Sequence, residues 1–217
     1  AWAPVMIVCS PRVIARRGAL DGLVELSELI DARVLLVSDA GLHAAGHVER
    51  AQAFLEVHTA HVTRHLDVAP NPTDADVIAC VEAAHGVDAI VALGGGSVMD
   101  VAKLAALIRD TGRPLEAHLG VQETRRGRTC LVLIPTTAGT GSEAQAAAIV
   151  SDAVSHIKMA FLAPGLSADV VLLDPTLTLS CPREVTAASG LDTLTHAVEV
   201  AVTTRGTAKS DALARSA

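Results

Sequence analysis

The chain has 217 residues, of which 50% are hydrophobic and 19% are charged, and its net charge is −7. This balance predicts one large or two small domains with a buried core, and it excludes a disordered chain. Aromatic residues make up only 1% of the chain, which excludes base-stacking platforms, and the negative charge argues against nucleic-acid or anionic-membrane partners.

The N-terminal segment from Trp2 to Cys9 is apolar, but no basic region precedes it, so we expect no signal peptide. Because the chain begins at Ala1 rather than Met, we also expect a trimmed N-terminus. No apolar run reaches the about 20 residues that a membrane span needs. The four cysteines are widely spaced and form no C-x-x-C pair, which predicts reduced thiols and a cytoplasmic protein.

Short apolar runs alternate with helical stretches through the first two-thirds of the chain. This alternation predicts an α/β fold with a doubly wound parallel sheet. The runs are continuously apolar, as expected for strands that are covered on both faces. We expect strands at 33–38, 88–93 and 129–134, and helices at 42–55, at 73–85 with Thr73 as the cap, and at 97–109.

The pattern changes after Pro135. Two strand-like runs, 156–162 and 170–173, follow a loop of small residues, and everything from Arg183 onward has helical character. We therefore expect a nucleotide-binding α/β domain over residues 1–180. Residues 181–217 would begin a helical metal-binding domain that is incomplete, because so few residues cannot bury a core of their own.

A glycine-rich turn, Gly94-Gly95-Gly96-Ser97, lies between an expected strand and an expected helix. Glycines there let a pyrophosphate approach the backbone, and the helix offers free N–H groups and the positive end of its dipole. The spacing fits neither G-x-G-x-x-G nor G-x-x-x-x-G-K-[ST]. A phosphate site and a tight turn without a ligand both remain open on this spacing.

Two other strand ends carry polar groups. Asp39 follows an expected strand, where its carboxylate can hold the ribose hydroxyls of adenosine and repel a 2′-phosphate. The alternative is an ordinary N-cap for the next helix. The loop from Thr136 and Thr137 to Ser142 offers hydroxyls and N–H groups at another strand end, where α/β sheets bind ligands, the alternative being a flexible surface loop.

Asp192 and His196 lie four residues apart in an expected helix and therefore on one face of it. One carboxylate and one imidazole suit Fe, Zn or Mn, although a complete site needs at least one more protein ligand. The alternative is an ordinary pair on a helix surface, and we assign the nearby Glu199 to that surface. Five earlier histidines are predicted to be solvated surface, with metal binding as the alternative: His43, His47, His58, His61 and His65.

Together these motifs resemble the iron-containing (group III) alcohol dehydrogenase family. The matching segments appear in the order of the family and nearly span the chain. They are Asp39 after its strand, Pro70-Asn71-Pro72-Thr73, Gly94 to Lys103, Pro135 to Glu143, Lys158, Asp174-Pro175 with Leu177, and Gly190 to Glu199.

The resemblance implies the dehydroquinate synthase-like superfold, with the active site in a cleft between an α/β domain and a helical domain. It implies hydride transfer between NAD(H) and a small alcohol or aldehyde, with Fe²⁺ or alternatively Zn²⁺ polarising the substrate oxygen. We expect a homo-oligomer. By the resemblance, Asp192 and His196 occupy the first two metal-ligand positions. Cofactor-contacting positions are Asp39, Asn71, Gly95, Gly96, Ser97, Asp100, Thr136, Thr137, Lys158 and Leu177.

The family supplies two further histidine ligands from later helices, and this sequence ends before them. We therefore expect either a fragment or an incomplete metal site, with weak metal binding and little activity from this chain alone. The alternatives are a glycerol dehydrogenase-like enzyme, a dehydroquinate synthase-like lyase and a non-catalytic nucleotide-binding domain. The lyase family differs at the glycine turn and at the first metal ligand. Asp192 and His196 argue against the family's reductases for chlorinated-aromatic breakdown products, which lack the metal-ligand pattern.

Overall fold

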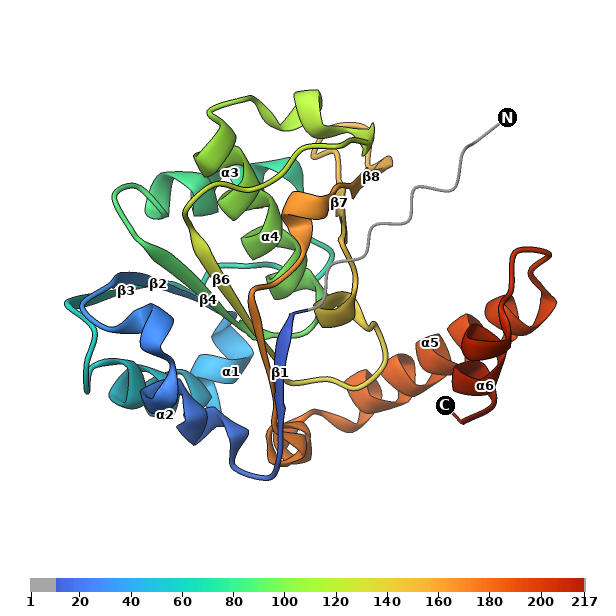
Figure 1. The fold of residues 1–217 in the computed structure, drawn as a ribbon, viewed down its shortest axis with the longest axis horizontal. Coiled ribbons are helices and arrows are strands. Elements are labelled where there is room, and N and C mark those ends of the chain that lie inside the picture. The colour runs from blue at the N-terminus through green and yellow to red at the C-terminus, as the bar shows by residue number, and fades with distance from the viewer. Residues whose placement is uncertain (1–10, 217) are drawn as a thin grey trace.

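A six-stranded sheet forms the centre of the molecule, as seen in a computed structural model that describes residues 11–216 (Figure 1). The apolar segment from Trp2 to Cys9 therefore lies outside the described residues. Every pairing in the sheet is parallel, which confirms the predicted α/β fold. In spatial order the strands are β1 (Arg12–Ala15), β9 (Val170–Leu173), β6 (Cys130–Pro135), β4 (Ala89–Gly94), β2 (Arg33–Val37) and β3 (His61–His65).

Helices cover both faces of this sheet. Alternate residues of one strand point to opposite faces, so Leu35 of β2 joins the core beneath α3 (Asp74–Ala83) and α4 (Gly96–Thr111). Leu36 joins the opposite core, which is covered by α2 (His47–Leu55) and the 3-10 helix Ala19–Glu25. Two separate apolar cores explain why the strand sequences are continuously hydrophobic.

The predicted cap of α3 is confirmed. The Oδ2 atom of Asp76 accepts hydrogen bonds of 2.8 Å from both the backbone N–H and the hydroxyl of Thr73. The expected helix 42–55 is instead two helices, α1 (Ala40–Ala44) and α2. Gly46 separates them with a φ of 77°, a left-handed conformation that glycine adopts without steric cost.

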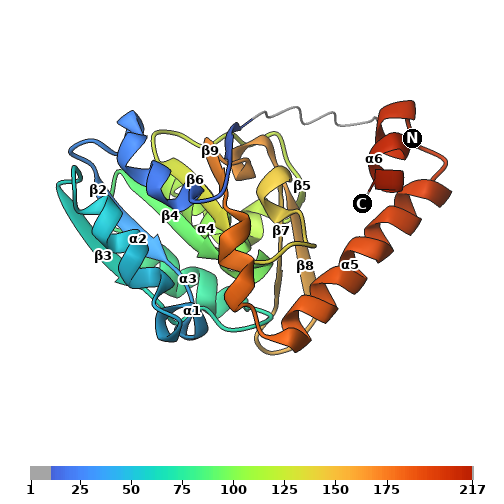
Figure 2. The same cartoon turned by 90° about the horizontal axis from the view of Figure 1, so that it is seen from below.

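A second, three-stranded sheet in the order β5-β8-β7 lies beside the main one (Figure 2). It contains β5 (Gly120–Val121), β7 (Ala147–Ser151) and β8 (Lys158–Leu162), which is shorter than the expected run 156–162. β7 is not among the strands that the sequence predicts. Its Ile149 N–H donates to the Asp100 carboxylate on α4 at 2.9 Å, and its Ser151 N–H donates to the Pro72 carbonyl at 2.9 Å.

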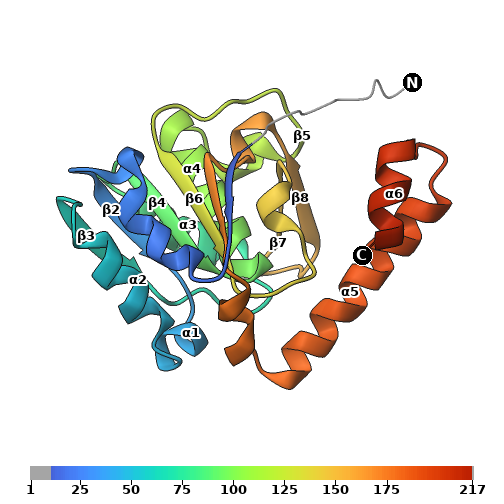
Figure 3. The ribbon, with the colours of Figure 1, turned by 60° about the horizontal axis from the view of Figure 1, so that its bottom comes forward.

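The C-terminal part consists of α5 (Arg183–Val202) and α6 (Ala208–Ser216), which extend away from the sheets (Figure 3). The expected helical character is confirmed, with an interruption at residues 203–207. Neither helix contains a buried residue, and α5 exposes Leu191, Leu194 and Val198. The division into domains at residue 180 stays a prediction. Within residues 11–216, no helix combines the length and apolar character that crossing a bilayer requires.

Three histidines of the stretch 43–65 depart from the predicted solvated surface. His58 and His65 are half-buried, with ring nitrogens that are shielded from solvent. His47 is buried, whereas His43 and His61 are exposed as expected. The Nε2 atom of His47 lies 2.6 Å from the Ser180 hydroxyl, and burial lowers the pKa of the imidazole. The assignment to solvated surface is therefore wrong for His47, because α2 turns it toward the segment that precedes α5.

Two thiols of the described residues, those of Cys80 and Cys130, are poor nucleophiles. Burial raises the pKa of Cys80 to about 12, and burial together with the nearby Asp169 and Glu28 carboxylates raises that of Cys130 to about 12. Both fit the role of small apolar residues.

Candidate functional site

The main candidate site lies where the order of the parallel strands reverses. From β2 the chain passes to β3 on one side, and after α3 it returns to β4 on the other side of β2. The loops after β2 and β4 therefore diverge and open a crevice at their carboxyl ends, the usual ligand site of such sheets. Asp39 follows β2 and the glycine turn ends β4, so the topology brings these two motifs together.

The three glycines of the turn have different surroundings. A Cβ atom at Gly94 would lie 2.5 Å from the Cβ of Val98, so the fold itself requires glycine there. A Cβ at Gly95 would lie 3.4 Å from the Thr137 hydroxyl, and one at Gly96 would lie 3.1 Å from the Thr140 side chain. The contact at Gly95 would be ordinary and the one at Gly96 would be tight. Gly95 is the N-cap of α4, so both glycines lie at the positive end of a 16-residue helix.

A cavity of about 540 Å³, here the Asp39 cavity, opens on one side of this turn. Asp39 accepts a hydrogen bond from the Leu42 N–H at 2.9 Å, which confirms that it is the N-cap of α1. Its other carboxylate oxygen has no hydrogen bond within residues 11–216. The Thr137 hydroxyl is buried without a partner in the same part of the chain. The rest of the lining is largely apolar and includes the fully buried Leu177.

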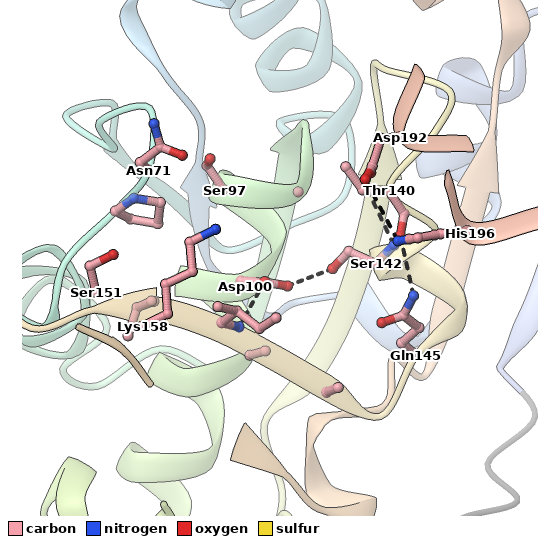
Figure 4. Close-up of a pocket in the computed structure, with 16 residues that line it drawn as sticks. Asn71, Ser97, Asp100, Thr140, Ser142, Gln145, Ser151, Lys158, Asp192 and His196 are labelled. Carbon is pink, nitrogen blue, oxygen red and sulfur yellow. Dashed lines mark hydrogen bonds and ion pairs between the residues drawn. The ribbon is translucent and has the colours of Figure 1, made fainter. Parts of the chain in front are cut away.

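A second cavity of about 400 Å³, here the Lys158 cavity, opens on the other side and is lined mainly by polar side chains (Figure 4). Ser97 lines both cavities, so they meet at the start of α4. Asn71 reaches the Lys158 cavity from a backbone with a φ of 54°, an uncommon left-handed conformation that asparagine tolerates better than most residues. The bond from Ser151 to Pro72 ties that segment to β7.

Asp192 and His196 lie at the Thr140 and Gln145 side of the Lys158 cavity, across from Asn71 and Lys158 (Figure 4). The Asp192 Oδ1 and His196 Nε2 atoms are 3.7 Å apart, and both side chains remain nearly half exposed, at 43% and 45%. Two such donors on one helix face fit half of a coordination sphere. Residues 11–216 contain no group of three or more His, Cys, Asp or Glu residues placed to hold a metal.

The structure thus brings every candidate residue to one of two adjoining cavities. The Asp39 cavity is lined by Asp39, Gly95, Ser97, Thr136, Thr137 and Leu177. The Lys158 cavity is lined by Asn71, Gly96, Ser97, Asp100, Lys158, Asp192 and His196.

Sequence reasoning missed the most deeply buried cation of the site. The Lys103 side chain is fully buried, and its Nζ donates to the Ser142 carbonyl at 2.5 Å, to the Ser142 hydroxyl at 2.6 Å and to the Ala147 carbonyl at 2.8 Å. Asp100 Oδ1 lies 3.4 Å away and also accepts from the Ser142 hydroxyl at 2.6 Å. These hydrogen bonds of Lys103, here called the clamp, connect α4 to the loop that lines the Lys158 cavity. The sequence feature that could have revealed this buried lysine is its position inside the otherwise apolar run 101–107.

Known proteins match most of this chain. The family model described as "Iron-containing alcohol dehydrogenase" matches residues 10–175, a range that ends before α5. Long-chain-alcohol dehydrogenase 1 of Geobacillus thermodenitrificans is 37% identical, with 91% of this chain and 51% of that protein aligned. NAD-dependent methanol dehydrogenase of Bacillus methanolicus is 31% identical, with 94% of this chain and 54% of that protein aligned.

Solved structures also match most of this chain. A 1,3-propanediol oxidoreductase superposes with a TM-score of 0.86 at 30% identity, over 94% of this chain and 55% of that chain. Sulfoacetaldehyde reductase from Bifidobacterium kashiwanohense in complex with NAD⁺ gives a TM-score of 0.78 at 28% identity, over 88% of this chain and 51% of that chain. The chain spans about half the length of these relatives. By the family match and the shared fold and motifs, it belongs to the iron-containing alcohol dehydrogenase family.

Proposed function

We propose that this chain forms the NAD(H)-binding part of a metal-assisted alcohol dehydrogenase that interconverts a small alcohol and its aldehyde. The observation that carries the proposal is the glycine turn at the strand-order reversal. Gly95 lines the Asp39 cavity and Gly96 lines the Lys158 cavity, so the turn lies between two cavities of different character. The names of the relatives, which include an NAD-dependent methanol dehydrogenase and a reductase in complex with NAD⁺, support this choice of cofactor.

The Asp39 cavity suits the adenosine part of the cofactor. Its apolar lining, including Leu177, would pack against the adenine ring, and the free oxygen of Asp39 would accept from the ribose hydroxyls. The partnerless Thr137 hydroxyl and the neighbouring Thr136 would contribute polar contacts next to the turn. The backbone N–H groups at Gly95, Gly96 and Ser97 would hold the pyrophosphate.

The Lys158 cavity suits the reacting end. NAD, when bound, supplies the hydride acceptor, and Fe²⁺ or Zn²⁺ supplies a Lewis acid for the substrate oxygen. Asn71 and Lys158 would orient the nicotinamide half of the cofactor from one side of the cavity. Asp100 holds Ser142 and Ile149, which also line the cavity, by hydrogen bonds to both residues. Asp192 and His196 would hold the metal from the opposite wall.

We also propose that residues 1–180 and 181–217 belong to different domains and that the protein is a cytoplasmic homo-oligomer. Two metal donors suffice only for weak binding, so we expect the 217-residue chain alone to show little dehydrogenase activity. Calorimetric titration of this chain with NAD⁺ tests the core of the proposal. The expected result is saturable binding, and no binding to a folded chain would overturn the proposal.

Asp39 should make the chain prefer NAD⁺ over NADP⁺. Asp39→Asn keeps a good N-cap for α1 but removes the charge that would repel a 2′-phosphate, so we expect NADP⁺ affinity to rise about tenfold. Binding titrations of parent and variant with both cofactors measure this change. Asp39→Gly is the matched variant that also removes the ribose contact, and it should weaken NAD⁺ binding. A parent chain that prefers NADP⁺ would contradict the assignment.

Asp192 should be needed for metal but not for nucleotide. In the whole protein that carries this sequence, Asp192→Ala is expected to lower metal content and alcohol-dependent NADH formation by at least about 100-fold, with NAD⁺ affinity unchanged. Metal analysis, an NADH absorbance assay and a binding titration measure the three quantities. Glu199→Gln on the same helix is the control and should resemble the parent. Full turnover after loss of Asp192 would show that this pair does not hold the catalytic metal.

A further inference from the structure

The loop after β6 and helix α5 meet at the level of their backbones. A Cβ atom built at Gly139 would lie 2.2 Å from the carbonyl oxygen of Ser189, 2.8 Å from its carbonyl carbon and 3.0 Å from its Cα. These are backbone atoms, so no side-chain rotation could relieve the contact. The Ser189 carbonyl also accepts from the Thr193 hydroxyl at 3.0 Å within the helix.

This contact is important because α5 packs only sparsely against the rest of the described chain. The helix has no buried residue, and its large apolar side chains such as Leu191 and Leu194 are exposed. Ser189 and Asp192 are half-buried and lie one turn apart, on the face that meets the loop and the Lys158 cavity.

The loop cannot yield easily to a larger residue. Its start is fixed by the bond from the Thr136 N–H to the Gly94 carbonyl at 3.1 Å. Its far end is held by the buried Lys103 through Ser142. A side chain at Gly139 would therefore displace α5 rather than the loop.

We propose that Gly139 is a positioning residue for the metal pair: its missing side chain lets α5 approach closely enough for Asp192 and His196 to face the Lys158 cavity. The inference rests on the proposed function for the role of that pair. The contact between Gly139 and Ser189 itself is independent of any ligand.

The test compares Gly139→Ala with Gly190→Ala in the 217-residue chain. Gly190 is next to Ser189, and a Cβ there would meet nothing within 4 Å, so the control makes the same chemical change in open space. Hydrogen–deuterium exchange of peptides covering residues 186–200 reports the seating of α5. Titration with Co²⁺ reports the metal pair, and titration with NAD⁺ reports the glycine turn.

In Gly139→Ala we expect faster exchange in α5, a Co²⁺ affinity lower by about tenfold and an NAD⁺ affinity within twofold of the parent. Gly190→Ala should match the parent or exchange more slowly, because alanine favours helix. Equal exchange rates in the two variants would overturn the positioning role. A third outcome is that the two variants differ in exchange but the parent binds neither Co²⁺ nor NAD⁺. The contact between Gly139 and Ser189 would then be confirmed, whereas the proposed function would be wrong. The role of Gly139 in positioning the metal pair would be overturned together with that function.

Discussion

Lys103→Met is expected to lower the free energy of unfolding by about 3 kcal/mol, the cost of leaving the partner of a buried charge without compensation. The ammonium group is fully buried and donates to three oxygen atoms of Ser142 and Ala147, with the Asp100 carboxylate beside it. Burial lowers the pKa of Lys103, and the nearby Asp100 opposes that shift. Methionine keeps most of the volume but donates no hydrogen bond, so three acceptors and the carboxylate lose their partner.

Urea unfolding followed by circular dichroism measures this change. Lys158→Met is the control, because Lys158 is exposed at the start of β8 and should change stability by less than about 0.5 kcal/mol. The double variant Lys103→Met with Asp100→Asn should recover part of the loss, because it removes the uncompensated charge. A Lys103→Met chain as stable as the parent would show that the clamp contributes nothing to folding.

Gly95→Val is expected to weaken NAD⁺ binding by at least about 100-fold with a nearly normal free energy of unfolding. The backbone at Gly95 is extended, with a φ of −78° and a ψ of −169°, which valine adopts readily. Its Cβ would only touch the Thr137 side chain, but its methyl groups would occupy the space proposed for the pyrophosphate. Titration with NAD⁺ and urea unfolding separate the two effects.

Gly94→Ala is the comparison variant and should show the opposite pattern, which is a lower free energy of unfolding with little change in NAD⁺ binding by the folded chain. Its Cβ would lie 2.5 Å from the side chain of Val98, so we expect a loss of about 2 kcal/mol from overpacking at the start of α4. If Gly95→Val binds NAD⁺ like the parent, the turn is a purely structural feature. Loss of folding in Gly95→Val but not in Gly94→Ala would contradict the assignment of the two glycines.

The sequence by itself determined the local elements whose signals lie in neighbouring residues. The continuous apolar runs predicted β2, β4, β6 and β9 and their burial on both faces, and Thr73 marked the start of α3. Residue types and short spacings predicted Asp39, the glycine turn, the loop from Thr136 to Ser142 and the pair of Asp192 and His196 as candidates. The family resemblance alone added Asn71, Asp100, Lys158 and Leu177. β3 escaped prediction because this edge strand is polar and half-exposed, without the apolar run that marks a central strand.

Only the tertiary structure decided how these elements meet. The order β1-β9-β6-β4-β2-β3 places the ends of β2 and β4 at a reversal point, and it divides the candidate residues between two cavities. The structure also buried His47 against Ser180, and it distinguished Gly94, where a Cβ would clash with Val98, from Gly95, where a Cβ would make only an ordinary contact. These outcomes depend on contacts between residues far apart in the chain, and such contacts leave no local periodicity in the sequence.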